Sequence, residues 1–211
     1  RKLGEYLKKQ FKIERLLLGD EGGYALDFTD NAEPLEIMKK IINETHIEKN
    51  IGLAIDVAAS GFMGEGKYYF EGKSITQREL GEVYNRYFNK NDLLLSIEDP
   101  FAESDVEGFK YLSTKLPKNK WVVGDDLTVT HATLIKKYSN DKLINAVIIK
   151  PNQVGTVTET AEAIKIAKRE GLRVIISHRS GETADNFIIH LAKACGADGI
   201  KIGAPARERI Y

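Results

Sequence analysis

The chain has 211 residues, 42% of them hydrophobic and 29% charged, so it is large enough to bury a core and too apolar to be disordered. Its 31 Lys and Arg residues balance 31 Asp and Glu residues, which argues against a nucleic-acid binder that relies on bulk positive charge. A single cysteine, Cys195, excludes an intrachain disulfide and a zinc site made of several cysteines, and it favours a reducing compartment such as the cytoplasm.

Helices and a glycine-rich turn are predicted for the first part of the chain. Residues 2–12 and 34–44 have the apolar periodicity of amphipathic helices, and Pro34 is well placed at a helix start. Between them, residues 19–23 form an acidic turn whose glycines would let the backbone fold Glu21 over the mouth of a barrel. A general acid and an ordinary residue of a surface turn are both consistent with Glu21 here.

The rest of the chain alternates predicted strands with predicted helices. Six short aliphatic runs are predicted as buried parallel strands: residues 51–55, 93–97, 121–123, 146–149, 173–176 and 199–202. An extra loop or hairpin is expected at 61–74, and helical periodicity predicts crossover helices over 78–88, 158–170 and 184–195. No apolar run approaches the roughly 20 residues that a membrane-spanning helix needs.

Six successive strand–helix units fit either an open doubly wound sheet or most of a (β/α)₈ barrel. No G-x-G-x-x-G segment follows the first strand, which favours the barrel over a dinucleotide-binding sheet. A closed barrel has eight strands and typically about 250 residues. We therefore expect an α/β fold, an incomplete TIM-like barrel with two strands outside this chain, which begins at Arg1 rather than at a methionine.

Acidic residues end three successive predicted strands. Asp56, Glu98 and Asp125 stand at carboxyl ends, which open on one face of a parallel barrel. Three carboxylates brought together repel one another unless a cation lies between them, and oxygen-only ligands favour Mg²⁺ over zinc. Each acid could instead cap the helix that follows, but three in succession favour the metal interpretation. The adjacent Asp99 and Asp126 supply further acids around the predicted site.

Two lysines close later strands. Lys150 follows the run 146–149, where burial beside a cation would favour the neutral amine that a general base needs to take a proton from carbon. A salt bridge to one of the three acids fits the same position, so both interpretations stay open. Lys201, in the run 199–202, favours pairing with an anionic group of a substrate.

Residues 177–183 join a strand to a helix and combine His178, Arg179 and Ser180 with backbone amides at the predicted helix start. This combination favours binding of a phosphate or carboxylate over ordinary helix capping by Ser or Thr. The remaining histidines are expected to be structural or exposed: His46, His131 and His190.

Six segments of the chain resemble the enolases, the phosphopyruvate hydratases of glycolysis, in both order and spacing. They are GDEGG at 19–23, SIEDPF at 96–101, GDDLT at 124–128, KPNQVG at 150–155, SHRSGET at 177–183 and GAPAR at 203–207. Six motifs in register are far more specific than any one of them, and they extend over essentially the whole chain. The resemblance implies that residues 1–211 are part of the C-terminal barrel domain of an enolase.

The resemblance also implies a reaction, the reversible Mg²⁺-dependent dehydration of 2-phosphoglycerate to phosphoenolpyruvate. It implies that Asp56, Glu98 and Asp125 hold a resident Mg²⁺ and that a second Mg²⁺ arrives with the substrate. Lys150 is implied to remove the proton from C2 of the substrate.

Further residues take roles by the same resemblance. Glu21 is implied to help hydroxide leave C3, and Lys201 to stabilise the charged carboxylate that forms after proton removal. The phosphate or the nearby part of the substrate is implied to be bound by His178, Arg179 and Ser180.

Parts of the family's fold are expected to lie outside this chain. These are a smaller N-terminal α+β domain with a second catalytic glutamate, the first barrel strands and the final barrel helix. The family also implies a homodimer or larger homo-oligomer for the full-length protein, a small-molecule substrate, and no nucleic-acid or membrane partner. Alternatively, the chain is a non-catalytic enolase fragment that acts as a binding or assembly partner.

Overall fold

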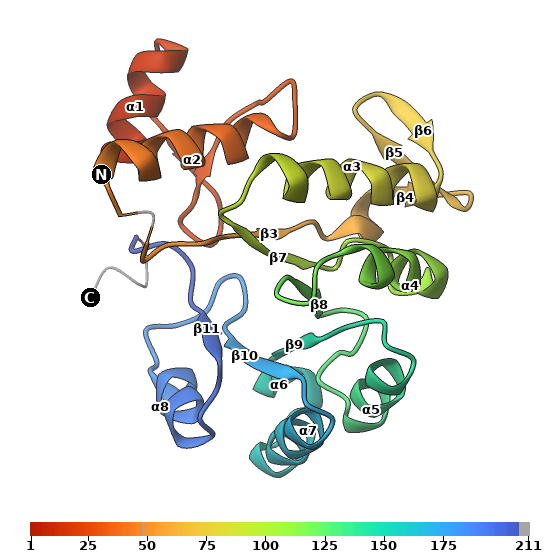
Figure 1. Ribbon diagram of the computed structural model, residues 1–211. Coiled ribbons are helices and arrows are strands. Elements are labelled where there is room, and N and C mark those ends of the chain that lie inside the picture. Colours follow the sequence, from red (N-terminus) through yellow and green to blue (C-terminus); the bar gives the residue numbers. More distant parts are fainter. Residues whose placement is uncertain (48, 207–211) are drawn as a thin grey trace.

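The computed structural model describes residues 1–47 and 49–206 and is built around a curled parallel sheet (Figure 1). In spatial order its six strands are β11 (Gly199–Lys201), β10 (Arg173–Ser177), β9 (Ala146–Ile149), β8 (Trp121–Gly124), β7 (Leu94–Glu98) and β3 (Leu53–Asp56). Every neighbouring pair is parallel, so all six carboxyl ends lie at the same end of the sheet. The sheet forms a half-barrel, which confirms the predicted incomplete TIM-like barrel, and each strand lies within two residues of its predicted ends.

The central strands are apolar on both faces. In β9, Val147 and Ile149 pack into the main core, whereas Ala146 and Ile148 belong to a small second cluster that also contains Val123 of β8. Because both faces are buried, a central strand reads as a continuous apolar run rather than as an alternating one.

Helices cover the outer side of the curled sheet (Figure 1). They are α3 (Gln77–Lys90), α4 (Val106–Lys115), α5 (Ala132–Asn140), α6 (Pro151–Val154), α7 (Val157–Arg169) and α8 (Phe187–Ala194). Thr76 and Thr156 begin α3 and α7 by accepting hydrogen bonds from backbone amides three residues later, which confirms helices near 78–88 and 158–170. In the part of the chain that the structure describes, no helix combines the length and apolar character needed to cross a bilayer.

The helix predicted over 184–195 begins later than expected. The Asp185 carboxylate accepts a hydrogen bond from the Phe187 amide at 2.7 Å, and α8 starts at that residue. The Phe187 amide is one of the first four of the helix, which have no acceptor within it, so Asp185 satisfies this donor at the helix start. Residues 178–186 are therefore a loop, and the prediction that 177–183 lies at a helix start is wrong.

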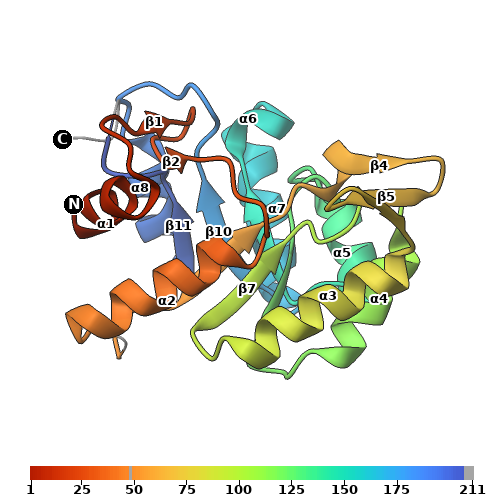
Figure 2. The same cartoon turned by 90° about the horizontal axis from the view of Figure 1, so that it is seen from above.

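The N-terminal segment forms two helices and a small hairpin. The helices are α1 (Lys2–Phe11) and α2 (Glu33–Thr45), as predicted. The hairpin pairs β1 (Leu17–Leu18) with β2 (Tyr24–Ala25), strands that the sequence did not predict, and it carries Glu21 in its turn. Figure 2 shows this hairpin beside β11 and α8, where the Glu21 carbonyl accepts a hydrogen bond from the Ala204 amide at 2.9 Å.

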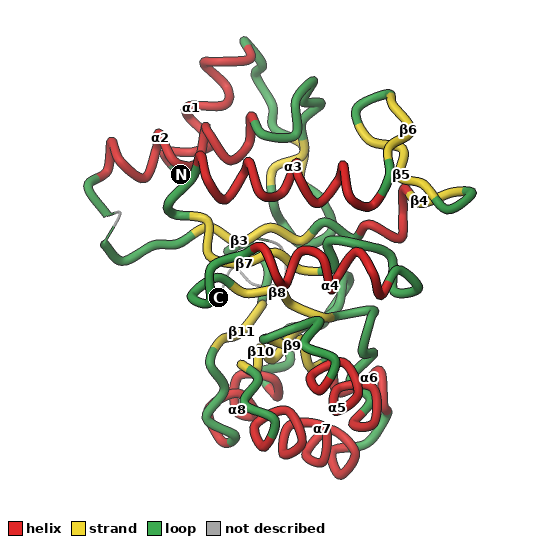
Figure 3. The backbone as a smooth tube through the Cα atoms, turned by 45° about the vertical axis from the view of Figure 1, so that its right-hand side comes forward, coloured by secondary structure: helices red, strands yellow, loops and turns green. Residues whose placement is uncertain are grey.

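The insertion predicted at 61–74 is a small antiparallel sheet at one end of α3 (Figure 3). It consists of a 3₁₀ turn, η1 (Ala59–Phe62), and the strands β4 (Met63–Gly64), β5 (Lys67–Phe70) and β6 (Lys73–Ile75). Tyr68 of β5 is fully buried, so this insertion packs into the main core.

Candidate functional site

Polar side chains surround a cavity of about 530 Å³ at the carboxyl ends of the strands. Eight of the nine predicted site residues line it: Glu21, Asp56, Asp125, Lys150, His178, Arg179, Ser180 and Lys201. The ninth, Glu98, is buried beside the cavity with 8% of its surface exposed and contacts the Lys201 ammonium. The structure therefore brings the predicted residues to one mouth.

Lys201 joins the two edges of the sheet. Its Nζ, on β11, lies 2.7 Å from Asp56 Oδ2 and 2.8 Å from Glu98 Oε1, on β3 and β7 at the far side of the sheet. Burial lowers the pKa of Lys201, but the charges of Glu98 and Asp56 outweigh this effect and raise the pKa above its ordinary value. Burial and the nearby Asp56 charge raise the pKa of Glu98, and Lys201 offsets only part of that rise. The two acids thus pair with an ammonium group, although Lys201 was predicted to face a substrate.

Lys150 makes an ion pair with Asp125, the acid that follows the neighbouring strand. Its Nζ donates to Asp125 Oδ2, and the two side chains are only 14% and 7% exposed. The Lys150 amide donates to Thr130 Oγ1 at 2.8 Å, which fixes the backbone at the end of β9. The salt bridge that was one interpretation of Lys150 is therefore present, and it places the amine at the cavity wall.

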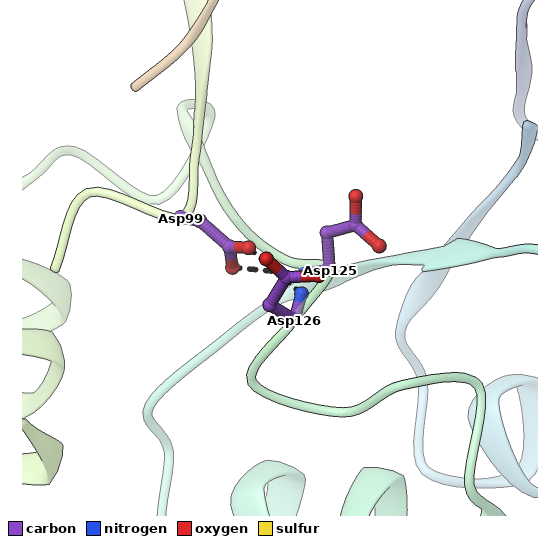
Figure 4. Close-up of side chains that lie close together, drawn as sticks. All are labelled: Asp99, Asp125 and Asp126. Atoms are coloured by element: carbon purple, nitrogen blue, oxygen red, sulfur yellow. Dashed lines mark hydrogen bonds between the residues drawn. The ribbon is translucent and has the colours of Figure 1, made fainter. Parts of the chain in front are cut away.

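Asp99, Asp125 and Asp126 form a tight acidic group (Figure 4). Each can offer one carboxylate oxygen within 4.8 Å of the others, so together they could hold a metal ion. Asp99 also accepts hydrogen bonds from the amides of Asp125 at 2.9 Å and Asp126 at 2.7 Å. Burial raises the pKa of Asp99 to about 7, although these two hydrogen bonds pull it down. The sequence analysis predicts Asp99 and Asp126 only as further acids around the metal site and not as ligands. The sequence signal for them is that each directly follows a predicted ligand, Glu98 or Asp125.

The predicted metal ligands are arranged differently from this group. Among the described residues, Asp56, Glu98 and Asp125 do not form a group whose carboxylate oxygens all lie within 4.8 Å of one another, although Asp56 and Glu98 share the Lys201 ammonium group. Two lysine ammonium groups lie against these carboxylates and neutralise part of their charge. The six carboxylates at the mouth outnumber its three cationic side chains, those of Lys150, Arg179 and Lys201, and their oxygen donors fit a hard divalent cation such as Mg²⁺.

His178 and Glu21 of the β1–β2 turn lie side by side in the lining of the cavity. The His178 side chain is 1% exposed, and its Nε2 lies 3.4 Å from Glu21 Oε2. Ser180 Oγ donates to Glu21 Oε1 at 3.1 Å. Neither ring nitrogen of His178 makes a hydrogen bond among the described residues, so the contact of Nε2 with Glu21 lacks hydrogen-bond geometry.

A glycine makes this close approach possible. A Cβ at Gly203 would lie 2.8 Å from the Glu21 carbonyl oxygen and 2.9 Å from His178 Cε1, and Gly203 has a φ of 73°. Only glycine fits there without moving Glu21 and His178. Arg207, at the end of the sixth sequence segment, lies outside the described residues.

The other predicted features of the site are exposed. Arg179 and Ser180 are on the surface of the cavity, and Arg179 Nη1 donates to Asn152 Oδ1 at 3.4 Å. The three remaining histidines are exposed and do not line the cavity, in agreement with the prediction: His46, His131 and His190.

Comparison with known proteins identifies relatives over nearly the full chain. A family model described as "Enolase, C-terminal TIM barrel domain" matches residues 1–210. The enolase of Neorickettsia sennetsu is 43% identical over 194 residues, covering 92% of this chain and 46% of that protein. The enolase of Anaplasma marginale is 43% identical over 212 residues, covering 99% and 48%, and that of Campylobacter jejuni is 41% identical over 190 residues, covering 90% and 46%. The chain thus spans about half the length of these curated relatives.

Proposed function

Because this chain belongs to the enolase family of hydro-lyases, we propose that its cavity is the active site of the reversible, Mg²⁺-dependent dehydration of 2-phosphoglycerate to phosphoenolpyruvate. One observation carries the proposal: acids, lysines and His178 from all parts of the half-barrel line one cavity. In this role the protein would act in glycolysis and gluconeogenesis, in the cytoplasm, and residues 1–211 would be part of its barrel domain.

The acids of the mouth are proposed to hold the metal. Asp56, Glu98 and Asp125 would provide the ligands of Mg²⁺ once the ion replaces the Lys150 and Lys201 ammonium groups that contact them, with Asp99 and Asp126 beside Asp125. A bound divalent cation supplies positive charge for the substrate carboxylate, which makes the weakly acidic C2 proton removable. Lys201 would then turn from Asp56 and Glu98 towards that carboxylate.

Lys150 and Glu21 are proposed to move the protons. Lys150 Nζ must leave its ion pair with Asp125 and lose a proton before it can accept the C2 proton. Glu21 also lines the cavity, where Ser180 and His178 contact its carboxyl group, and it would deliver a proton to the leaving C3 hydroxyl so that water departs. His178, Arg179 and Ser180 would bind the phosphate or the adjacent part of the substrate.

The open edges of the sheet favour a second candidate, a fragment that binds other chains without catalysis. Among the described strands, β3 and β11 each have a neighbour on one side only. Unpaired strand edges invite pairing with another chain. A homodimer or larger homo-oligomer is proposed for the full-length protein, and analytical ultracentrifugation tests it.

Substrate binding separates the two candidates, and turnover is followed in the same mixture. The chain is mixed with 2-phosphoglycerate and Mg²⁺, and phosphoenolpyruvate is followed by its ultraviolet absorbance. We expect Mg²⁺-dependent binding of the substrate but little turnover by residues 1–211 alone. The proposed site is wrong if the substrate does not bind in the presence of Mg²⁺, and rapid turnover would show that this chain needs no second acid.

A further inference from the structure

The turn after β7 has a strained backbone at the acid site. Asp99 is not a glycine, yet its φ is 39°, in the left-handed region. Such conformations persist only where the surrounding structure holds them. The turn directly follows Glu98, and the Asp99 side chain accepts the amides of Asp125 and Asp126. Its conformation therefore sets the positions of acids on two strands.

Two buried tyrosine hydroxyls hold this turn from outside the cavity. Tyr84 of α3 donates to the Pro100 carbonyl at 2.8 Å. Tyr68 of β5 accepts a hydrogen bond from the Ala102 amide at 3.0 Å and donates to Asp105 Oδ2 at 2.7 Å. Both tyrosines are 1% exposed or less. Burial raises the pKa of both hydroxyls, so they stay protonated and remain donors.

The aromatic rings of the two tyrosines have a separate role in the core. Phe101, in the middle of the turn, packs edge to face against Tyr68 with ring centroids 6.0 Å apart and against Tyr84 at 5.7 Å. Phenylalanine at either position would keep these ring contacts. The hydroxyls are therefore unnecessary for filling the core. Their hydrogen bonds are made to the backbone of Pro100 and Ala102 and to the side chain of Asp105, which caps α4.

We propose that Tyr68 and Tyr84 are positioning residues of the acid site. Their hydroxyls fix the turn 99–102, and through the turn they place the Glu98 carboxylate and the Asp99 carboxylate that orients Asp125 and Asp126. Neither tyrosine lines the cavity, so both act through the turn rather than on a ligand. The part of the proposal that concerns metal binding rests on the proposed function, whereas the part that concerns the turn does not.

Removal of single hydroxyls tests the proposal. Tyr68→Phe and Tyr84→Phe are compared with Tyr111→Phe, which removes a hydroxyl that donates to Glu82 between α4 and α3 on the protein surface. Each variant is measured for thermal unfolding, for Mg²⁺ affinity by titration calorimetry and for hydrogen exchange at the amides of Asp125 and Asp126. The loss of one buried hydrogen bond is expected to weaken Mg²⁺ binding about three- to tenfold and to speed exchange at these amides at least as much. Tyr111→Phe should change neither.

The outcomes separate a positioning role from a structural one. Unchanged Mg²⁺ affinity and unchanged amide exchange in both Tyr68→Phe and Tyr84→Phe would overturn the proposal, and so would equal losses in Tyr111→Phe. If the unsubstituted chain binds no Mg²⁺, the proposed function fails, and the exchange of the two aspartate amides alone decides whether the tyrosines hold the turn. If one tyrosine variant does not fold, the other gives the same test.

Discussion

Lys150 and Lys201 end two strands at the same mouth, one in the centre of the sheet and one at its edge. Lys150 follows β9, is 14% exposed and pairs with one acid from the adjacent strand β8. Lys201 ends β11, is 25% exposed and pairs with two acids from the opposite side of the sheet. The central position of β9 thus lets Lys150 pair with one acid of the adjacent strand. The edge position of β11 lets Lys201 pair with acids across the open side of the half-barrel.

The largest expected effect separates the two lysines by chemistry. In the full-length protein that contains this chain, Lys150→Ala should slow exchange of the C2 proton of 2-phosphoglycerate by at least about 100-fold, because it removes the general base. Mg²⁺ affinity should stay nearly intact, since the carboxylates remain. Exchange is followed by NMR in deuterated water. Loss of metal binding instead would make Lys150 a structural residue.

The residues just before the two lysines give a matched comparison of packing. Ile149 in β9 is fully buried, and Ile200 in β11 is 38% exposed. Ile149→Ala should lower the free energy of unfolding by about 2–5 kcal/mol through lost burial and the cavity left behind. Ile200→Ala should lower it by less than about 1 kcal/mol. Urea unfolding measures both, and equal losses would show that the edge of β11 is covered in solution.

The same contrast explains what the sequence could predict. The strand 146–149 is recognisable because both of its faces are apolar, and the acids and lysines at strand ends must share one mouth in any parallel barrel. The pairing of Lys201 with Asp56 depends on how far the sheet curls, which no local pattern encodes. Likewise, the left-handed Asp99 depends on residues distant in sequence, because its amide donates to the Val123 carbonyl and its carbonyl accepts from the Ala59 amide.

Short elements limit the prediction elsewhere. The helix α8 begins three residues after the predicted residue 184, where the Asp185 carboxylate accepts the Phe187 amide. The two-residue strands beside Glu21 are too short to leave a period-two pattern in the sequence, although their glycine turn was recognisable.

Removal of the Lys201 ammonium group should have a smaller effect on stability than Ile149→Ala. Lys201→Met leaves Asp56 and the buried Glu98 without their cation, and we expect a loss of about 1–3 kcal/mol, reduced by the partial exposure of Lys201 and Asp56. Mg²⁺ should restore more stability to Lys201→Met than to the unsubstituted chain, because the ion can replace the lost charge. Thermal unfolding with and without Mg²⁺ measures this difference, and an equal gain in both proteins would contradict it.

The smallest expected effect is a pH dependence that distinguishes the acid site from the rest of the fold. The pKa of Asp99 is raised to about 7, above its value of about 4 in an unfolded chain, so the folded state holds a proton that the unfolded state has lost. The resulting stability is complete below about pH 4 and is lost as the pH rises through 7. Burial also raises the pKa of Glu98, which therefore changes stability in the same direction.

Without divalent cations, the free energy of unfolding should fall between pH 5 and pH 8, by an amount on the order of 1 kcal/mol because water reaches this mouth. Asp99→Asn should flatten the profile, and a profile that rises with pH in this range would mean that the acids are already neutralised by their own lysines.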